Sequence, residues 1–145
     1  MTQEDKLLLL KDLCGRLPYG VICHANEINI DGELIFINKL YNIAALYYDN
    51  TIGKFEHCPI NDIKPYLRPM SSMTEEEKRH ISKMMCLRTY DDGVVHDMTY
   101  PIYTPYYVME DCLSYLRSIH MDYSGLIEKN LALEAKEGMY NIKEK

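Results

Sequence analysis

The pattern of apolar residues changes at residues 63–85, and this change constrains the fold more than any other feature of the sequence. Before this stretch, short alternating apolar segments are separated by turn residues, as in β-structure; after it, apolar residues recur every three or four positions, as in helices. Within it, Pro69 interrupts the apolar pattern. Thr74 and Glu77 then form the signature of a capping box, in which each side chain bonds to the backbone N–H of the other residue. The sequence therefore predicts a strand that ends near Leu67 and a helix that begins at Thr74.

The first residues predict another helix. Thr2 is suited to be its N-cap, and Gly15 followed by Pro18 indicates that the helix ends near Cys14. We expect one apolar stripe to form the buried face of this helix: Leu7, Leu10, Leu13, Cys14 and Leu17.

The residues between this helix and Thr74 predict about five short strands. The strand-like segments are 19–25, 27–30, 33–38, 43–48, 55–58 and 63–67. In the first of them, Val21, Cys23 and Ala25 alternate and are expected to share one face. Asp31-Gly32 lies between two alternating segments, and this dipeptide favours the type I′ turn because both central residues need a positive φ. The sequence therefore predicts a β-hairpin whose turn is Asp31-Gly32.

The last third of the chain predicts further helices. Thr104-Pro105 has the residue types of an N-cap followed by the first helical position. The helix that follows carries a continuous apolar face, expected in the core, made of Met109, Cys112, Leu113, Leu116, Ile119 and His120. A shorter helix is expected to begin at Asp122 or Ser124 and to end at Asn130, and residues 131–133 are expected to return to the core.

These elements together predict an α+β fold. It begins with a helix, continues as a small antiparallel β-barrel or strongly bent sheet of about five strands, and ends with C-terminal helices. An SH3-like barrel is our specific expectation. We expect residues 1–145 to form a single domain, with a helix plus strand-rich half (1–70) and a helix-rich half (71–145).

Composition narrows the class of protein. The chain is 47% hydrophobic and 26% charged, as folded proteins are, and its formal net charge is −6, which disfavours binding to nucleic acid. No apolar run is long enough for a membrane span, and the acidic start of the chain lacks the features of a signal peptide. The five cysteines are scattered, which favours free thiols. We therefore expect a cytoplasmic protein without a membrane segment.

Three stretches resemble a known group of proteins. They are L-L-L-K-D-L-C-G-R-L-P-Y-G-V, D-I-K-P-Y-L-R-P-M-S-S-M-T-E-E-E-K and G-L-I-E-K-N-L-A-L-E-A-K-E-G-M-Y, about a third of the chain. They resemble small uncharacterised proteins from genomes of gut anaerobes and their phages or mobile elements. Asn130 stands where that group is expected to carry glycine, an exchange that a left-handed helix terminator accepts. The resemblance implies no activity and favours an accessory protein.

The cysteines and histidines offer candidates for a metal site or a thiol nucleophile. Cys23-His24 and His57-Cys58 are the closest pairs, but adjacent residues of a strand point to opposite faces, so each pair supplies one ligand per side. The spacing of paired zinc ligands is missing, and so are the sequence motifs of the common catalytic sites. The sequence therefore predicts no metal, no cofactor and no catalytic residue, and it favours a protein that is not an enzyme.

The segment from Tyr100 to Tyr107 is the candidate binding surface. Its binding candidates are Tyr100, Tyr103, Tyr106 and Tyr107, which offer large rings on a backbone stiffened by two prolines. The alternative is that these rings cover the gap between sheet and helix.

From this segment we expect a non-enzymatic accessory protein that acts as an interaction module, with another protein as partner. A second possibility is a nucleotide- or nucleic-acid-binding accessory protein. It would use aromatic stacking on these tyrosines beside four basic residues: Lys64, Arg68, Arg79 and Lys83.

Overall fold

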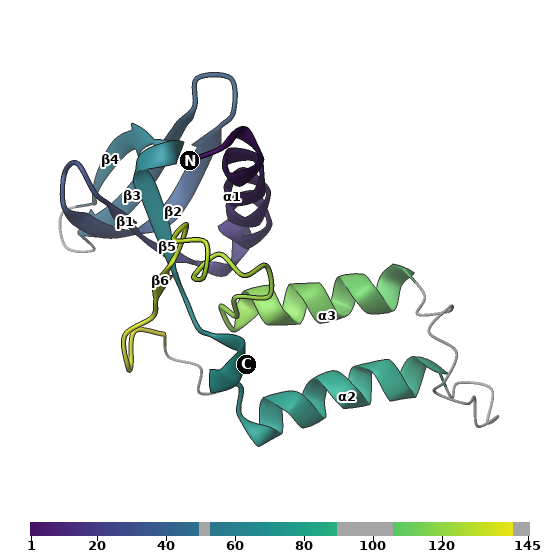
Figure 1. Cartoon of the computed structure of the whole chain (residues 1–145). Helices are drawn as coiled ribbons and strands as arrows, with labels where there is room; N and C mark the ends of the chain where they lie inside the picture. Colours follow the sequence, from purple (N-terminus) through teal and green to yellow (C-terminus); the bar gives the residue numbers. More distant parts are fainter. Residues whose placement is uncertain (50–52, 90–105, 141–145) are drawn as a thin grey trace.

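The computed structural model describes residues 1–49, 53–89 and 106–140 and shows an α+β fold. Helix α1 lies against one face of a six-stranded sheet, and helices α2 and α3 form a hairpin that extends away from the sheet (Figure 1). The helices are α1 (Gln3–Arg16), α2 (Glu75–Thr89) and α3 (Tyr106–Ser118). The strands are β1 (Ile22–Ala25), β2 (Ile30–Asn38), β3 (Ile43–Asp49), β4 (Lys54–Pro59), β5 (Ile63–Leu67) and β6 (Leu133–Glu134).

The sheet is open, with strand order β4-β3-β2-β1-β5-β6. The first five strands pair antiparallel, and β6 pairs parallel to β5. The two ends of the sheet, β4 and β6, do not pair with each other. The predicted α+β class, N-terminal helix and C-terminal helices are confirmed, whereas the closed SH3-like barrel is not.

The first hairpin does not turn at Asp31-Gly32. Both residues lie inside β2 and pair with His24 and Cys23 of β1, and the turn is formed by residues 26–29. Asn29 supplies the positive φ of this turn, at 51°. Gly32 is needed for a different reason, because a Cβ there would lie 2.9 Å from the carbonyl oxygen of Tyr47. The predicted turn was wrong because this glycine serves close packing between strands.

Helix α1 forms where it was predicted but buries another face. Its cap is a capping box in which Asp5 N–H donates to Thr2 Oγ1 and Thr2 N–H donates to Asp5. The buried residues are Leu9, Asp12, Leu13 and Arg16, whereas Leu7 is 49% exposed and Cys14 is exposed. Of the predicted face, Leu13 alone is buried. Asp12 and Arg16 are buried because they neutralise each other in a salt bridge.

Residues 119–140 return to the sheet and complete its core. Leu126, Leu131 and Ala132 join the cluster formed by α1 and β1–β5. The predicted short helix after residue 122 is instead a series of turns, in which the carboxylate of Asp122 accepts from the N–H groups of Leu126 and Ile127. The carboxylate satisfies these donors without a helix. Asn130 has a φ of 57°, the left-handed conformation expected of it.

Helix α3 packs mainly against α2 and only at one end against α1. Leu113 and Leu116, expected in the core, are half-buried, and Met109 is 53% exposed. Ile119 and His120, just after the helix, are buried as expected. The expectation was wrong for the helix itself because the helix hairpin extends away from the sheet, so the apolar face of α3 packs mainly against α2 (Figure 1). Among the described residues, no helix is long and apolar enough to cross a membrane.

The predicted capping box of α2 is confirmed and extends into an ion pair. Glu77 N–H donates to Thr74 Oγ1, and Thr74 N–H donates to Glu77 Oε2. Both oxygens of the same carboxylate accept from Arg68, at 2.8 and 3.0 Å. Burial alone would raise the pKa of Glu77, but these hydrogen bonds from Arg68 and Thr74 outweigh burial and hold it below its usual range.

A carboxyl group whose pKa is lowered by folding stabilises the protein above its unfolded pKa, and this contribution is lost as the pH falls through the folded value. We therefore expect Glu77→Gln to lower the free energy of unfolding by about 1–3 kcal/mol at neutral pH, because Arg68 loses its charged partner. The difference from the wild type should shrink as the pH falls from about 5 to about 3. Urea denaturation at several pH values measures this. Glu76→Gln, at an exposed neighbour, is the control. A difference that does not change with pH would contradict the role of the ion pair.

Candidate functional site

The two faces of the sheet at β2, β3 and β4 differ in what covers them. On one face, Leu34, Ala44, Leu46 and Cys58 are buried and pack in the core with α1. The opposite face, which we call the outer face, carries side chains that alternate with these in the strands. Helix α1 lies on the core face only (Figure 1).

Aromatic side chains gather on the outer face next to the edge of the sheet. Ala45 of β3 pairs with Phe36 of β2 on one side and with His57 of β4 on the other, and Tyr47 pairs with Phe55. The ring of His57 lies edge-on to Phe36 at 6.5 Å and to Phe55 at 5.5 Å. We call these five residues the outer patch.

The side chains of the outer patch contact one another, but the rings of Phe36 and Phe55 are also exposed to solvent. Ala45 is only 2% exposed because its cross-strand neighbours flank it, whereas Phe36 is 44% and Phe55 52% exposed. A β-bulge between Leu34 and Phe36 gives β2 one extra residue at this point, and the extra residue, Ile35, is also 45% exposed. A contiguous apolar surface of this kind is typical of a protein contact rather than of a solvated face.

The outer patch borders a free strand edge. In the described part of the chain, no strand pairs with β4 on the side away from β3. Ile60 N–H donates to the carbonyl of Asn42, at 3.0 Å. Hydrogen-bonded pairs alternate along an antiparallel ladder, so Glu56 and Cys58 also bond toward β3. The backbone groups of Phe55 and His57 therefore point outward, away from the sheet.

The other half of the outer face is polar. Asp31 accepts hydrogen bonds from His24 Nδ1 at 2.7 Å and from the Tyr66 hydroxyl at 3.1 Å. Lys136 Nζ lies 3.9 Å from the same carboxylate and 5.4 Å from the centre of the Tyr66 ring. The C-terminal segment, which pairs with β5 through β6, thus places Lys136 next to this cluster.

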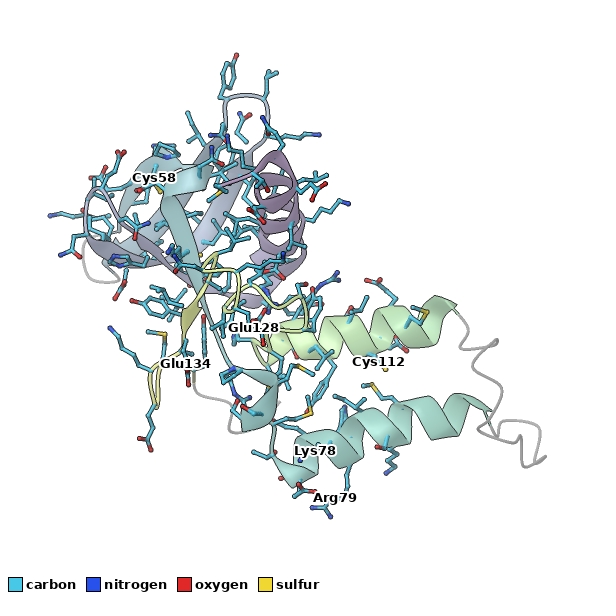
Figure 2. All side chains as sticks on the ribbon, viewed as in Figure 1. Cys58, Lys78, Arg79, Cys112, Glu128 and Glu134 are labelled. Carbon is cyan, nitrogen blue, oxygen red and sulfur yellow. The ribbon has the colours of Figure 1, made fainter. Side chains whose placement is uncertain are left out.

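The thiols of Cys23 and Cys58 point away from the neighbouring histidines. Cys23 and Cys58 face the core, and His24 and His57 face outward, as strand alternation requires. Burial raises the pKa of the Cys23 thiol and raises that of Cys58 to about 11, so both thiols stay protonated at neutral pH. Cys58 lies in the sheet and Cys112 in α3, well apart (Figure 2). Among the described residues, no three His, Cys, Asp or Glu side chains are grouped as metal ligands.

The tyrosine segment predicted as the binding surface lies almost wholly outside the described residues. Tyr100 and Tyr103 fall in the range 90–105, and Tyr106 and Tyr107 begin α3. Whether these four tyrosines bind a partner therefore stays a prediction.

The basic residues named beside the tyrosines are dispersed. Arg68 donates to Glu77 and to the carbonyls of Ile119 and Ser72, and Lys64 donates to Asn130. Arg79 lies on α2, away from the sheet (Figure 2). Arg79 Nε also donates to the carbonyl of Glu75 at 3.3 Å, so three of the four basic residues are engaged within the fold, and they form no continuous surface for phosphates.

Sequence reasoning missed the outer patch, although part of its signal is present. Phe55 and His57 alternate with Glu56 and Cys58, which marks one face of β4 as aromatic. The bulge that brings Phe36 next to Ala45 cannot be recognised from the sequence, because it depends on pairing with β3.

The comparisons with known proteins name no relative. No protein-family model matches the chain, and neither a curated protein nor a solved structure is significantly similar to it. The resemblance to proteins of gut bacteria and their phages therefore stays an expectation from the sequence motifs.

Proposed function

We propose that this protein is a non-enzymatic accessory protein that acts as a protein-interaction module. The observation that carries the proposal is the outer patch, in which Phe36 and Phe55 are each about half exposed on a sheet face that α1 leaves uncovered. Aromatic residues are enriched in the centres of protein interfaces because they bury much area with few torsions to fix. We assign the protein to the cytoplasm on the grounds of its sequence alone.

Two further observations favour a protein partner over a nucleic acid. The net charge is −6, and Arg68 and Lys64 are engaged in hydrogen bonds within the fold. Binding to nucleic acid gains most of its free energy from cations placed against phosphates. An aromatic patch next to an unpaired strand edge instead offers apolar contact together with backbone hydrogen bonds, as strand addition uses.

A photo-cross-linking amino acid placed at position 36 tests this function in cells that naturally contain the protein. We expect it to give protein adducts of defined mass, because Phe36 lies in the exposed patch. The same probe at position 11, where Lys11 is exposed on α1, is the matched control. Adducts that form only at position 36, and that disappear when Phe55 is changed to Ser, support the proposal. Equal labelling at both positions, or none, would show that the outer patch is not a protein contact.

A further inference from the structure

We propose that the free edge of β4 pairs with the β4 strand of a second copy of this chain, antiparallel and centred on Phe55. This inference rests on the proposed function and names the partner at that surface. It extends the six-stranded sheet of each copy into one continuous sheet across a two-fold axis.

The outward-pointing backbone groups limit how two β4 strands can pair. Only Phe55 and His57 present both N–H and C=O groups outward, and Pro59 has no N–H to donate. An antiparallel pair therefore has to set at least one of these two residues opposite its own copy or opposite the other. Symmetric pairing leaves three registers, centred on Phe55, on Glu56 or on His57, and the last one sets Phe55 opposite Pro59 and loses hydrogen bonds.

The charges of β4 choose between the remaining two registers. Centring on Glu56 sets the two Glu56 carboxylates directly opposite each other, and like charges at such positions are destabilising. Centring on Phe55 sets Lys54 of each copy opposite Glu56 of the other, which gives two attractive pairs. Both side chains are exposed in the single chain and free to meet their partners across the axis. The strand is thus complementary in charge to itself in one register.

The outer patch becomes continuous in the same register. Phe55 and His57 point to the outer face, so the two Phe55 rings meet across the axis and join the patch of one copy to that of the other. Phe55 is the most exposed aromatic ring of the patch, at 52%, and it gains the most from this contact. Backbone pairing allows the registers centred on Phe55 and on Glu56, and charge together with the contact between the two Phe55 rings selects the one centred on Phe55.

Sedimentation equilibrium over a range of concentrations measures the proposed dimer. We expect a reversible equilibrium between the 17.0 kDa chain and a species of twice this mass, with a Kd below about 100 µM, as for small interfaces. Lys54→Glu and Glu56→Lys should each raise the Kd about tenfold or more, because each variant turns two attractive pairs into repulsive ones. The double variant Lys54→Glu/Glu56→Lys should restore the wild-type Kd, and an equal mixture of the two single variants should form a mixed dimer.

Charge reversals outside the edge are the controls. Lys11→Glu and Glu128→Lys change the net charge by the same amounts at exposed positions away from β4, and they should leave the Kd unchanged. Circular dichroism checks that every variant is folded. A chain that stays at 17.0 kDa up to about 0.5 mM overturns the inference, and so does a dimer that the double variant fails to restore. If such a monomer still gives adducts at position 36, the proposed function stands and only the identity of the partner is wrong.

Discussion

We expect Arg16→Met to lower the free energy of unfolding by about 3–5 kcal/mol, because it leaves the Asp12 carboxylate buried without its partner. Arg16 is fully buried at the end of α1. Its Nε and Nη2 donate to the two oxygens of Asp12 at 2.6 and 3.0 Å, and Nη2 also donates to the carbonyl of Met121 at 2.7 Å. The guanidinium lies 5.0 Å from the centre of the Tyr123 ring. It therefore ties α1 to the segment that follows α3, and urea denaturation measures the loss.

The pH dependence of the stability of Arg16→Met shows whether the unpaired charge of Asp12 causes the loss. Burial raises the pKa of Asp12, and the hydrogen bonds and charge of Arg16 act against that rise. Removal of Arg16 raises the pKa of Asp12 further. A carboxyl group whose pKa is raised in the folded state stabilises the protein at low pH, and this contribution is lost as the pH rises through the folded pKa. The loss in Arg16→Met should therefore be smaller near about pH 4 than near about pH 8.

Two further variants serve as controls for the ion pair. Asp12→Leu/Arg16→Met removes both charges and should recover much of the stability, since no buried charge is left without a partner. Lys11→Met, at an exposed position of the same helix, should change the free energy of unfolding by less than about 0.5 kcal/mol. If the double variant is as unstable as Arg16→Met, the packing of the arginine matters more than the charge of Asp12.

Leu13→Ala and Leu113→Ala should differ clearly although they remove the same atoms. Leu13 is fully buried between α1 and the sheet, so its truncation should cost about 2–5 kcal/mol from lost burial and the cavity left behind. Leu113 is half-buried in the helix hairpin and should cost about 1 kcal/mol. Thermal and urea denaturation of both variants measure the difference.

Leu7→Ala is the matched control for this pair, because Leu7 lies on α1 but is 49% exposed. It should be nearly neutral. Equal losses in Leu13→Ala and Leu113→Ala would mean that the helix hairpin is part of the main core, contrary to its position in Figure 1.

Features that depend on neighbours along the chain were predictable. The capping box of Thr74 and Glu77 involves residues three positions apart, and both of its hydrogen bonds are present. The alternation of Val21, Cys23 and Ala25 marked the buried face of β1 and of the residue before it, and all three are buried. The positive φ of Asn130 likewise follows from its own residue type.

Features that depend on distant partners were not predictable. Gly32 was taken for a turn residue, but the carbonyl of Tyr47 on the neighbouring strand is what excludes a side chain there. The outer patch likewise exists because a bulge in β2 sets Phe36 beside Ala45 of β3.

The sequence by itself determined the positions of α1, α2 and most of the strands, because hydrophobic period, capping and turn preference act over a few residues. Only the tertiary structure decided which face of α1 is buried, where the first hairpin turns and which face of the sheet is left uncovered. Leu9 and Leu13 face the core together with Asp12 and Arg16. The hydrophobic pattern of a helix assigns charged residues to its solvent-exposed face, so it cannot predict that this pair is buried. Its burial is stable because the two charges neutralise each other and Met121, far along the chain, accepts from the arginine.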